Sequence, residues 1–236
     1  MLRKHGSYKK LTRVITHISK LRKETKMSNI TLYRHALSGH AHRVETFLSI
    51  LGLSANIVDV DLANGAHKQE EFLRKNSFGQ VPVLEDADVI LADSNAILVY
   101  LASRYDEHRT WLPENPVAAA EVQRFLSIAA GKIAFGPAVA RLVNVFGAQL
   151  DHEHAINLAH VILAELDAHL EEREWLAADH ATIADIANYA YIAHAPEGDV
   201  SLAEYANVRS WLTRIESISG FVPMQVTEVG LASKAA

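Results

Sequence analysis

The stretch Val81-Pro82-Val83-Leu84, followed by Asp93-Ser94-Asn95-Ala96-Ile97, decides how the fold of this chain is interpreted. Pro82 stands at the head of a short apolar strand. Because proline has no N–H for a sheet ladder, it indicates a sheet edge, a bulge or a cis peptide bond. Asp93-Ser94 precedes an apolar run with helical spacing and predicts a helix start, whose free N–H groups and positive dipole end favour a carboxylate. Together the two segments predict a site for a small peptide-like molecule with a free acid group.

The residues around this stretch complete an α/β unit. Residues 30–33 and 57–60 suit two strands with an amphipathic helix between them, which predicts parallel pairing and a right-handed crossover. Residues 81–84 and 89–91 suit a hairpin, and a helix from 95 to about 105 closes the unit. We therefore predict an α/β domain over residues 28–107.

The second half of the chain carries helical patterns and no clear strand. These patterns cover residues 118–146, 154–172, 183–194 and 202–217, and Pro137 is expected to kink or interrupt the first. Thr182 and Asp185 have the spacing of a capping box before a helix that is apolar nearly all round, which predicts a buried central helix. We predict a linker over 108–116 and an all-helical domain over 117–236.

Composition limits the chemistry. The 236 residues are 49% hydrophobic and 22% charged, as in ordinary globular chains, and they include no cysteine. The protein therefore has no thiol nucleophile, disulfide or cysteine metal site, and any thiol must come from a ligand. The histidines near residues 151–160 lack the spacing that places two ligands on one helical face, so no metal site is predicted.

The first 27 residues differ from the rest. Nine of the 23 Lys and Arg residues lie in residues 1–26 against a single acidic residue, which leaves 14 basic and 27 acidic residues elsewhere. That acidic balance argues against a nucleic-acid partner for the body of the chain. No uninterrupted apolar run approaches the ~18 residues of a membrane span, so no membrane partner is predicted. Because Met27 precedes the first strand, residues 1–27 are interpreted as a basic extension, either disordered or an upstream-start artefact, with targeting or surface binding as the alternative.

Four features in this order resemble the cytosolic glutathione transferase family: the segment from Tyr33 to Ser38, Val81-Pro82-Val83-Leu84, Asp93-Ser94 with Ala96-Ile97, and Thr182-Ile183-Ala184-Asp185-Ile186-Ala187. Leu37-Ser38-Gly39 and His67-Lys68 are similar to the serine-type members, theta-like and bacterial. The resemblance covers about residues 28–225. It implies a thioredoxin-like N-terminal domain with a C-terminal helical bundle domain. It also implies a cytoplasmic homodimer that joins glutathione to hydrophobic electrophiles, with glutathione as cosubstrate and no permanently bound cofactor.

The resemblance assigns Ser38 to catalysis. A free thiol of pKa ~8.5 is mostly protonated at neutral pH, and a serine hydroxyl at a helix N-terminus favours the thiolate through a hydrogen bond and the helix dipole. Ser38 would thus be an electrostatic activator of the glutathione sulfur. The alternative is that Ser38 only caps the helix.

The resemblance also assigns the glutathione-binding residues. Val81, held by a cis bond before Pro82, would pair with the cysteinyl backbone, with Gln80 a weaker candidate for the same peptide. Ser94 would bind the γ-glutamyl carboxylate and Asp93 the α-ammonium group, although many members have glutamate or glutamine in place of Asp93. The remaining pair, His67 and Lys68, would contact the glycine carboxylate, or else they lie in a solvated loop. His40 either tunes the sulfur or is a surface histidine.

The sequence also allows three other functions. The same thiolate serves glutathione-dependent peroxidases, isomerases and dehalogenases, which the sequence does not separate from transferases. The departures at Asp93 and His40 also allow a non-catalytic binding or scaffold protein on the same fold. A remote third option makes the basic extension the functional part, binding anionic membrane or nucleic acid.

Overall fold

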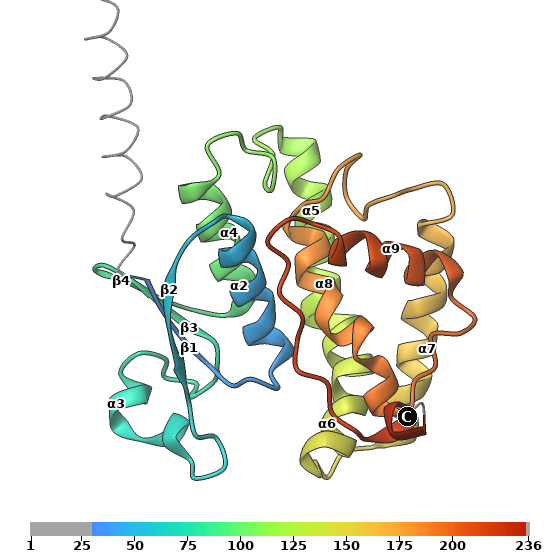
Figure 1. The fold of residues 1–236 in the computed structure, drawn as a ribbon, viewed down its shortest axis with the longest axis horizontal. Helices are drawn as coiled ribbons and strands as arrows, with labels where there is room; N and C mark the ends of the chain where they lie inside the picture. The colour runs from blue at the N-terminus through green and yellow to red at the C-terminus, as the bar shows by residue number, and fades with distance from the viewer. Residues whose placement is uncertain (1–29, 235–236) are drawn as a thin grey trace, which may run out of the picture.

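The computed structural model describes residues 30–234, so the predicted basic extension over 1–27 lies outside the described residues. Its sheet consists of β1 (Ile30–Arg34), β2 (Ala55–Asp59), β3 (Val83–Asp86) and β4 (Val89–Ala92) in the order β2-β1-β3-β4. β1 pairs parallel with β2 and antiparallel with β3, and β3 and β4 form an antiparallel hairpin. The predicted strand, helix, strand opening is confirmed, with α2 (Gly39–Ile50) as the crossover helix (Figure 1).

Apolar side chains point to both faces of the sheet, and helices pack on both faces. Ile30, Leu32 and Leu84 are buried against α2 and α4 (Ser94–Tyr105), which lie between the sheet and the helical half of the molecule (Figure 1). Val83 points to the other face, where it packs with Phe72 of the short helix α3 (Glu70–Leu73). Because successive side chains of a strand point to opposite faces, this arrangement follows directly from the apolar pattern.

The second half is all helical. Its elements are α5 (Pro116–Ile128), η2 (Ala129–Ala138), α6 (Val139–Phe146), α7 (His152–His169), α8 (Ile183–Ala193), η3 (Ala195–Gly198), α9 (Ala206–Glu216) and η4 (Gly230–Lys234). α8 occupies the centre, with every residue from Ile183 to Ile192 buried, as the sequence predicts (Figure 1). Its capping box is also present, because Thr182 and Asp185 satisfy each other's backbone donors. The predicted thioredoxin-like and helical halves are therefore both found.

Proline accounts for two of the differences between predicted and observed boundaries. β3 begins at Val83 and not at Val81, since Pro82 lacks the donor that a ladder position requires. Pro116, placed in the linker from sequence, is the first residue of α5, where its missing N–H costs nothing. Pro137 does not break its helix. It lies in η2, a π-helical stretch that continues α5 into α6.

Within residues 30–234, one continuous helical stretch, Pro116–Phe146, is long and apolar enough to cross a membrane by length and composition alone. In the sequence this stretch is not an uninterrupted apolar run, because Arg124, Lys132 and Arg141 lie within it. In the fold this helix packs against α7 and α8. Core helices of globular proteins meet the same criterion, so the stretch is weak evidence for a membrane span.

Candidate functional site

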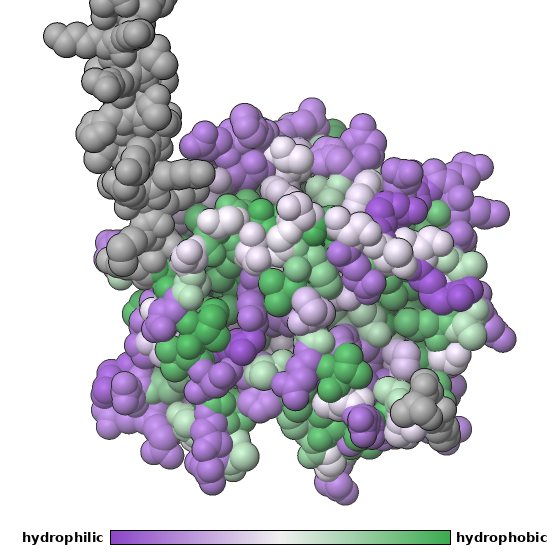
Figure 2. All heavy atoms as spheres, in the orientation of Figure 1, coloured by the Kyte–Doolittle hydropathy of each residue, from purple (hydrophilic) through white to green (hydrophobic). Residues whose placement is uncertain are grey.

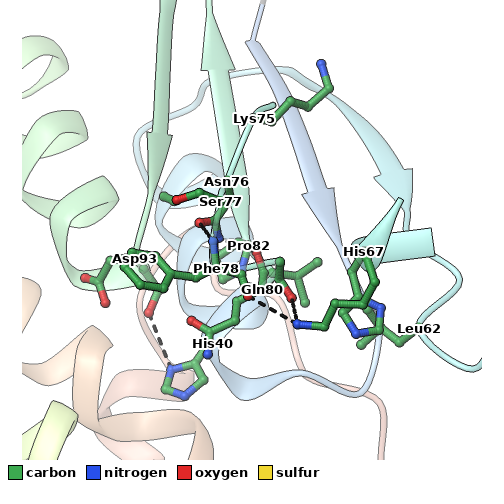
Figure 3. Close-up of a pocket in the computed structure, with 15 residues that line it drawn as sticks. His40, Leu62, His67, Lys75, Asn76, Ser77, Phe78, Gln80, Pro82 and Asp93 are labelled. Carbon is green, nitrogen blue, oxygen red and sulfur yellow. Dashed lines mark hydrogen bonds between the residues drawn. The ribbon is translucent and has the colours of Figure 1, made fainter. Parts of the chain in front are cut away.

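A cavity of about 840 Å³ opens beside the start of β3 and the N-terminus of α4, a volume typical of small-molecule sites. All seven residues predicted to bind glutathione line it, namely His67, Lys68, Gln80, Val81, Pro82, Asp93 and Ser94. His67 lies on one side, Asp93 and His40 lie on the other, and Gln80 and Pro82 lie between them (Figure 3). Residues from three separate segments thus meet at one place.

The N-terminus of α4 forms one end of the cavity. Asp93 caps the helix, and one carboxylate oxygen accepts hydrogen bonds of 2.9 Å from the N–H groups of Asn95 and Ala96. The carbonyl of Asp93 accepts from the N–H of Ile97. Within residues 30–234 the Ser94 N–H has no acceptor, so it remains available to a ligand. A free N–H at a helix N-terminus, next to a serine hydroxyl, suits a carboxylate.

A buried arginine supports this end of the site. Arg43 of α2 is 1% exposed and donates to Ser94 Oγ at 3.2 Å and to Asn95 Oδ1 at 2.7 Å. Burial lowers the pKa of Arg43 to about 10, which leaves it charged at neutral pH. Arg43 was not identified from the sequence, although an arginine four residues before Phe47, and so on the same face of an amphipathic helix, was a usable signal. The positive charge of Arg43 therefore lies next to Ser94 and favours an acid group bound to that serine.

His40 lies inside the cavity and is not a surface histidine. Its Nδ1 is 3.4 Å from Ser94 Oγ, and its ring packs edge-on against Tyr191 with centroids 4.9 Å apart. Burial, together with the charge of Arg43, lowers the pKa of His40 to about 3. His40 is therefore neutral at physiological pH and can accept or donate one hydrogen bond at each ring nitrogen, according to its tautomer.

Lys68 forms the end of the cavity opposite the N-terminus of α4. Its ammonium donates to the carbonyls of Phe78 and Gly79, both at 3.2 Å, which leaves one of its three protons for a ligand. A side chain at Gly79 would place Cβ 2.7 Å from the carbonyl of His67, and Gly79 has φ +58°, so glycine is required beside this pair. Nδ1 of His67 is buried and has no partner within residues 30–234. Lys75, by contrast, points away and pairs with Glu85 (Figure 3).

The wall between the two ends is backbone. The Val81–Pro82 peptide bond is cis, and Val81 stands before the first residue of β3. Within residues 30–234 the Val81 N–H and carbonyl have no hydrogen-bond partner, so both are free to pair with an extended ligand. Asn76 holds this segment, because its amide donates to the carbonyl of Gln80 at 2.8 Å and its oxygen accepts from the Phe78 N–H at 3.1 Å. The Gln80 side chain itself is exposed.

Ser38 lies beside the cavity and is not among the residues that line it. It is the N-cap of α2, and its Oγ accepts from the Ala41 N–H at 3.3 Å. The structure therefore shows the capping role that the sequence left as an alternative. Capping uses only an acceptor position of the hydroxyl, so the proton of Ser38 is still available. His40, two residues further along α2, does line the cavity, which places Ser38 next to it.

The turn before Ser38 meets the helical half. Arg141 of α6 is 1% exposed and donates to the carbonyl of Leu37 at 2.8 Å and to Glu197 at 2.6 Å. The rings of His35 and Phe146 lie edge to face at 5.8 Å. In the space-filling view the surface is hollowed at the lower edge between the α3 side and α6, with apolar residues on the α6 side (Figure 2). Ser38 thus stands where the two halves of the molecule meet.

Comparison with known families gives two matches. A model of the glutathione S-transferase N-terminal domain matches residues 28–103, and one of the glutathione S-transferase C-terminal domain matches residues 132–218. Glutathione S-transferase 3 of Zea mays is 35% identical over 209 residues, which are 83% of this chain and 92% of that protein. Glutathione S-transferase theta-2B of Homo sapiens is 32% identical over 165 residues, which are 66% of this chain and 68% of that protein.

Solved structures show the same similarity. A crystal structure of a glutathione S-transferase from Pseudomonas fluorescens superposes with a TM-score of 0.79 at 30% identity, covering 84% of this chain and all of that one. A glutathione transferase homolog from Drosophila mojavensis, solved with bound glutathione, superposes with a TM-score of 0.74 at 27% identity and covers 81% of this chain and 89% of that one.

Proposed function

The chain belongs to the glutathione S-transferase family, and from this premise we propose that it binds glutathione in the cavity beside α4 and activates the thiol for attack on hydrophobic electrophiles. The observation that carries the proposal is the arrangement of the cavity. A helix N-terminus and a carboxylate stand at one end, a lysine stands at the other, and an unpaired backbone segment lies between. Glutathione is an extended tripeptide with an acid group at each end and an ammonium beside one of them, so its charges fit this order.

We assign the contacts as follows. The γ-glutamyl carboxylate binds the Ser94 N–H and hydroxyl, in the field of the buried Arg43, because anions are stabilised at helix N-termini. The ammonium pairs with Asp93, whose second carboxylate oxygen is not used in capping. The cysteinyl backbone pairs with Val81. Lys68 binds the glycine carboxylate with its remaining proton, and His67 stands beside it.

Ser38 activates the sulfur by donating a hydrogen bond from its hydroxyl to the thiolate. The hydrogen bond and the N-terminus of α2 both favour the charged form, so the thiol loses its proton to solvent at a lower pH than in free glutathione. The thiolate then forms the new carbon–sulfur bond as the leaving group departs from the electrophile. Ser38 remains protonated throughout and is neither base nor nucleophile.

The electrophile is proposed to bind beside the turn that carries Leu37, against α6. His35 and Phe146 offer aromatic surface there, and the backbone of Leu37 is held by Arg141. An apolar wall next to an activated thiolate suits hydrophobic electrophiles. Family membership supports two further assignments, a cytoplasmic homodimer and glutathione as a cosubstrate with no permanently bound cofactor. Sedimentation of the purified chain tests the dimer.

Calorimetric titration with glutathione, combined with turnover of an activated aryl chloride, tests the proposal. The wild type is expected to bind glutathione and to turn the chloride over. Ser38→Ala is expected to bind glutathione with a similar Kd and to lose most of kcat. A chain that does not bind glutathione would sink the proposal, and a Ser38→Ala variant with wild-type turnover would favour a non-catalytic role for this serine.

A further inference from the structure

Arg43 is a buried cation that the protein itself does not neutralise. Its side chain is 1% exposed, and among residues 30–234 it forms no ion pair. Arg141, which is also 1% exposed, pairs with Glu197 at 2.6 Å. Burial lowers the pKa of Arg43 more than the attraction of nearby Asp93 raises it. Because a buried charge without a counter-ion is costly, an anion bound close to Arg43 would complete this part of the protein.

The hydrogen bonds of Arg43 lead to the N-terminus of α4. Both protons of its Nη1 are used, because Ser94 Oγ accepts at 3.2 Å and Asn95 Oδ1 accepts at 2.7 Å. Its Nε and Nη2 are buried and have no partner within the described part of the chain. Asn95 is itself fixed, since its amide donates to the carbonyl of Leu126 in α5 at 3.0 Å. The guanidinium is therefore held against Ser94 from the protein side.

The bond from Arg43 restricts the direction of the Ser94 hydroxyl. A guanidinium only donates, so Ser94 Oγ is the acceptor and the serine proton cannot point toward Arg43. Among the described residues the other hydrogen-bond partner of Oγ is Nδ1 of His40, at the longer distance of 3.4 Å. Ser94 and His40 both line the cavity, whereas Arg43 does not. The serine proton is thus left for His40 or for a ligand, and a carboxylate is the stronger acceptor because it is charged.

We propose that Arg43 is a positioning residue that makes this end of the cavity selective for the γ-glutamyl carboxylate. Its Nη1 holds the Ser94 hydroxyl with the proton toward the ligand, and the bound carboxylate serves as its counter-ion. The inference rests on the proposed binding of glutathione and adds a residue of α2 that acts on the ligand through Ser94. Arg43 should therefore matter only for ligands that carry this acid group.

The test compares glutathione with γ-aminobutyryl-cysteinylglycine, an analogue that lacks only the γ-glutamyl carboxylate. Calorimetric titration gives Kd for each ligand. The wild type is expected to prefer glutathione by roughly tenfold to a hundredfold, the range of a charge-assisted hydrogen bond. Arg43→Met is expected to weaken glutathione by roughly tenfold, while the affinity for the analogue should not fall.

Further variants separate positioning from net charge and from folding. Arg34→Met removes the same charge from an arginine that pairs with Glu45 and Asp59, and it should keep the wild-type preference. Asn95→Ala removes the oxygen that holds Arg43 and should lower the preference by roughly threefold. If thermal unfolding shows that Arg43→Met does not fold, Asn95→Ala and Arg43→Lys provide the test, because lysine keeps the charge and loses the planar fork. A wild-type preference in both of these variants would overturn the inference.

The outcomes distinguish this inference from the proposed function. A wild type that does not bind glutathione contradicts the proposed function itself. If the wild type binds glutathione but Arg43→Met keeps its preference, or if the wild type has no preference, only the inference is wrong. Equal weakening of both ligands in Arg43→Met would assign this arginine to folding alone and would also overturn the inference. In a Ser94→Ala background Arg43→Met should change the preference less than in the wild type, and an equal change would show that Arg43 acts without Ser94.

Discussion

Replacing Glu197 by glutamine is expected to destabilise the fold far more than the same change in an exposed ion pair. Glu197 of η3 is 2% exposed and accepts from Arg141 at 2.6 Å, from His194 at 2.7 Å and from the Thr227 N–H at 3.1 Å. Burial disfavours its charge, but the hydrogen bonds from His194 and Thr227 and the charge of Arg141 outweigh burial and hold its pKa at about 2. A buried carboxylate with three donors joins α6, η3 and the C-terminal segment.

The magnitude follows from what glutamine leaves behind. The amide has one oxygen for three donors, and its NH2 group replaces the second oxygen, so at least one donor loses its acceptor. The charge of Arg141, itself 1% exposed, loses its counter-ion. Removing one partner of a buried ion pair costs about 3–5 kcal/mol. Because Arg141 also holds the Leu37 carbonyl at 2.8 Å, the turn before Ser38 should loosen as well.

Urea denaturation at one protein concentration measures the free energy of unfolding. The control is Glu165→Gln, since Glu165 pairs with Lys132 on the surface, where both side chains are about half exposed. Exposed pairs are worth about 0–1 kcal/mol, so the control should stay close to the wild type. A loss of less than about 1 kcal/mol for Glu197→Gln would show that this buried carboxylate contributes no more than an exposed one.

The pH dependence checks the same claim with a definite sign. The pKa of Glu197 falls from an ordinary 4.5 to about 2 on folding, so its contribution is present above pH 4.5 and is lost as pH falls toward 2. The difference in stability between wild type and Glu197→Gln should therefore shrink over that range. A stability difference between the two proteins that stays constant from neutral pH down to about pH 2 would contradict the lowered pKa of Glu197.

Three further variants test the site and its scaffold. Lys68→Met removes the ammonium proposed to pair with the glycine carboxylate and should weaken glutathione binding by roughly tenfold. The affinity should also depend less on salt, as measured by calorimetry at two ionic strengths. Asp93→Asn keeps a good cap for α4 and should weaken glutathione by roughly tenfold, but should leave the affinity for an analogue without the α-amino group unchanged. Asp185→Ala leaves the Thr182, Leu176 and Trp211 donors without an acceptor and should lower the free energy of unfolding by at least ~3 kcal/mol. The control is Asp151→Ala, which removes an exposed helix cap and should lower it by about 1 kcal/mol.

Sequence patterns predicted those parts of the molecule that depend on local chemistry. The helix start at Asp93-Ser94, the capping box at Thr182 and Asp185 and the alternation in β1 are set by residues within one element, and the structure contains all three. The seven cavity residues were also named from sequence, because family motifs mark them one by one.

Contacts between distant segments could not be predicted in the same way. Nothing near Arg43 in the sequence shows that it lies behind Ser94, 51 positions further on. Arg141 contacts Leu37 across 104 positions, and Tyr191 meets Gly39 from the opposite half of the chain. His40 looked like a surface residue because the first turn of a helix is usually exposed, but the Tyr191 ring of α8 packs against it, and partial burial together with the charge of Arg43 keeps it neutral.

The titration of the bound glutathione thiol in wild type and Ser38→Ala is the decisive measurement of whether Ser38 activates the thiol. A thiolate activated by Ser38 should show a pKa well below the ~8.5 of a free thiol in the wild type, and the alanine variant should return most of the way to that value. Equal thiol pKa values in the two proteins, with glutathione bound to both, would contradict the account.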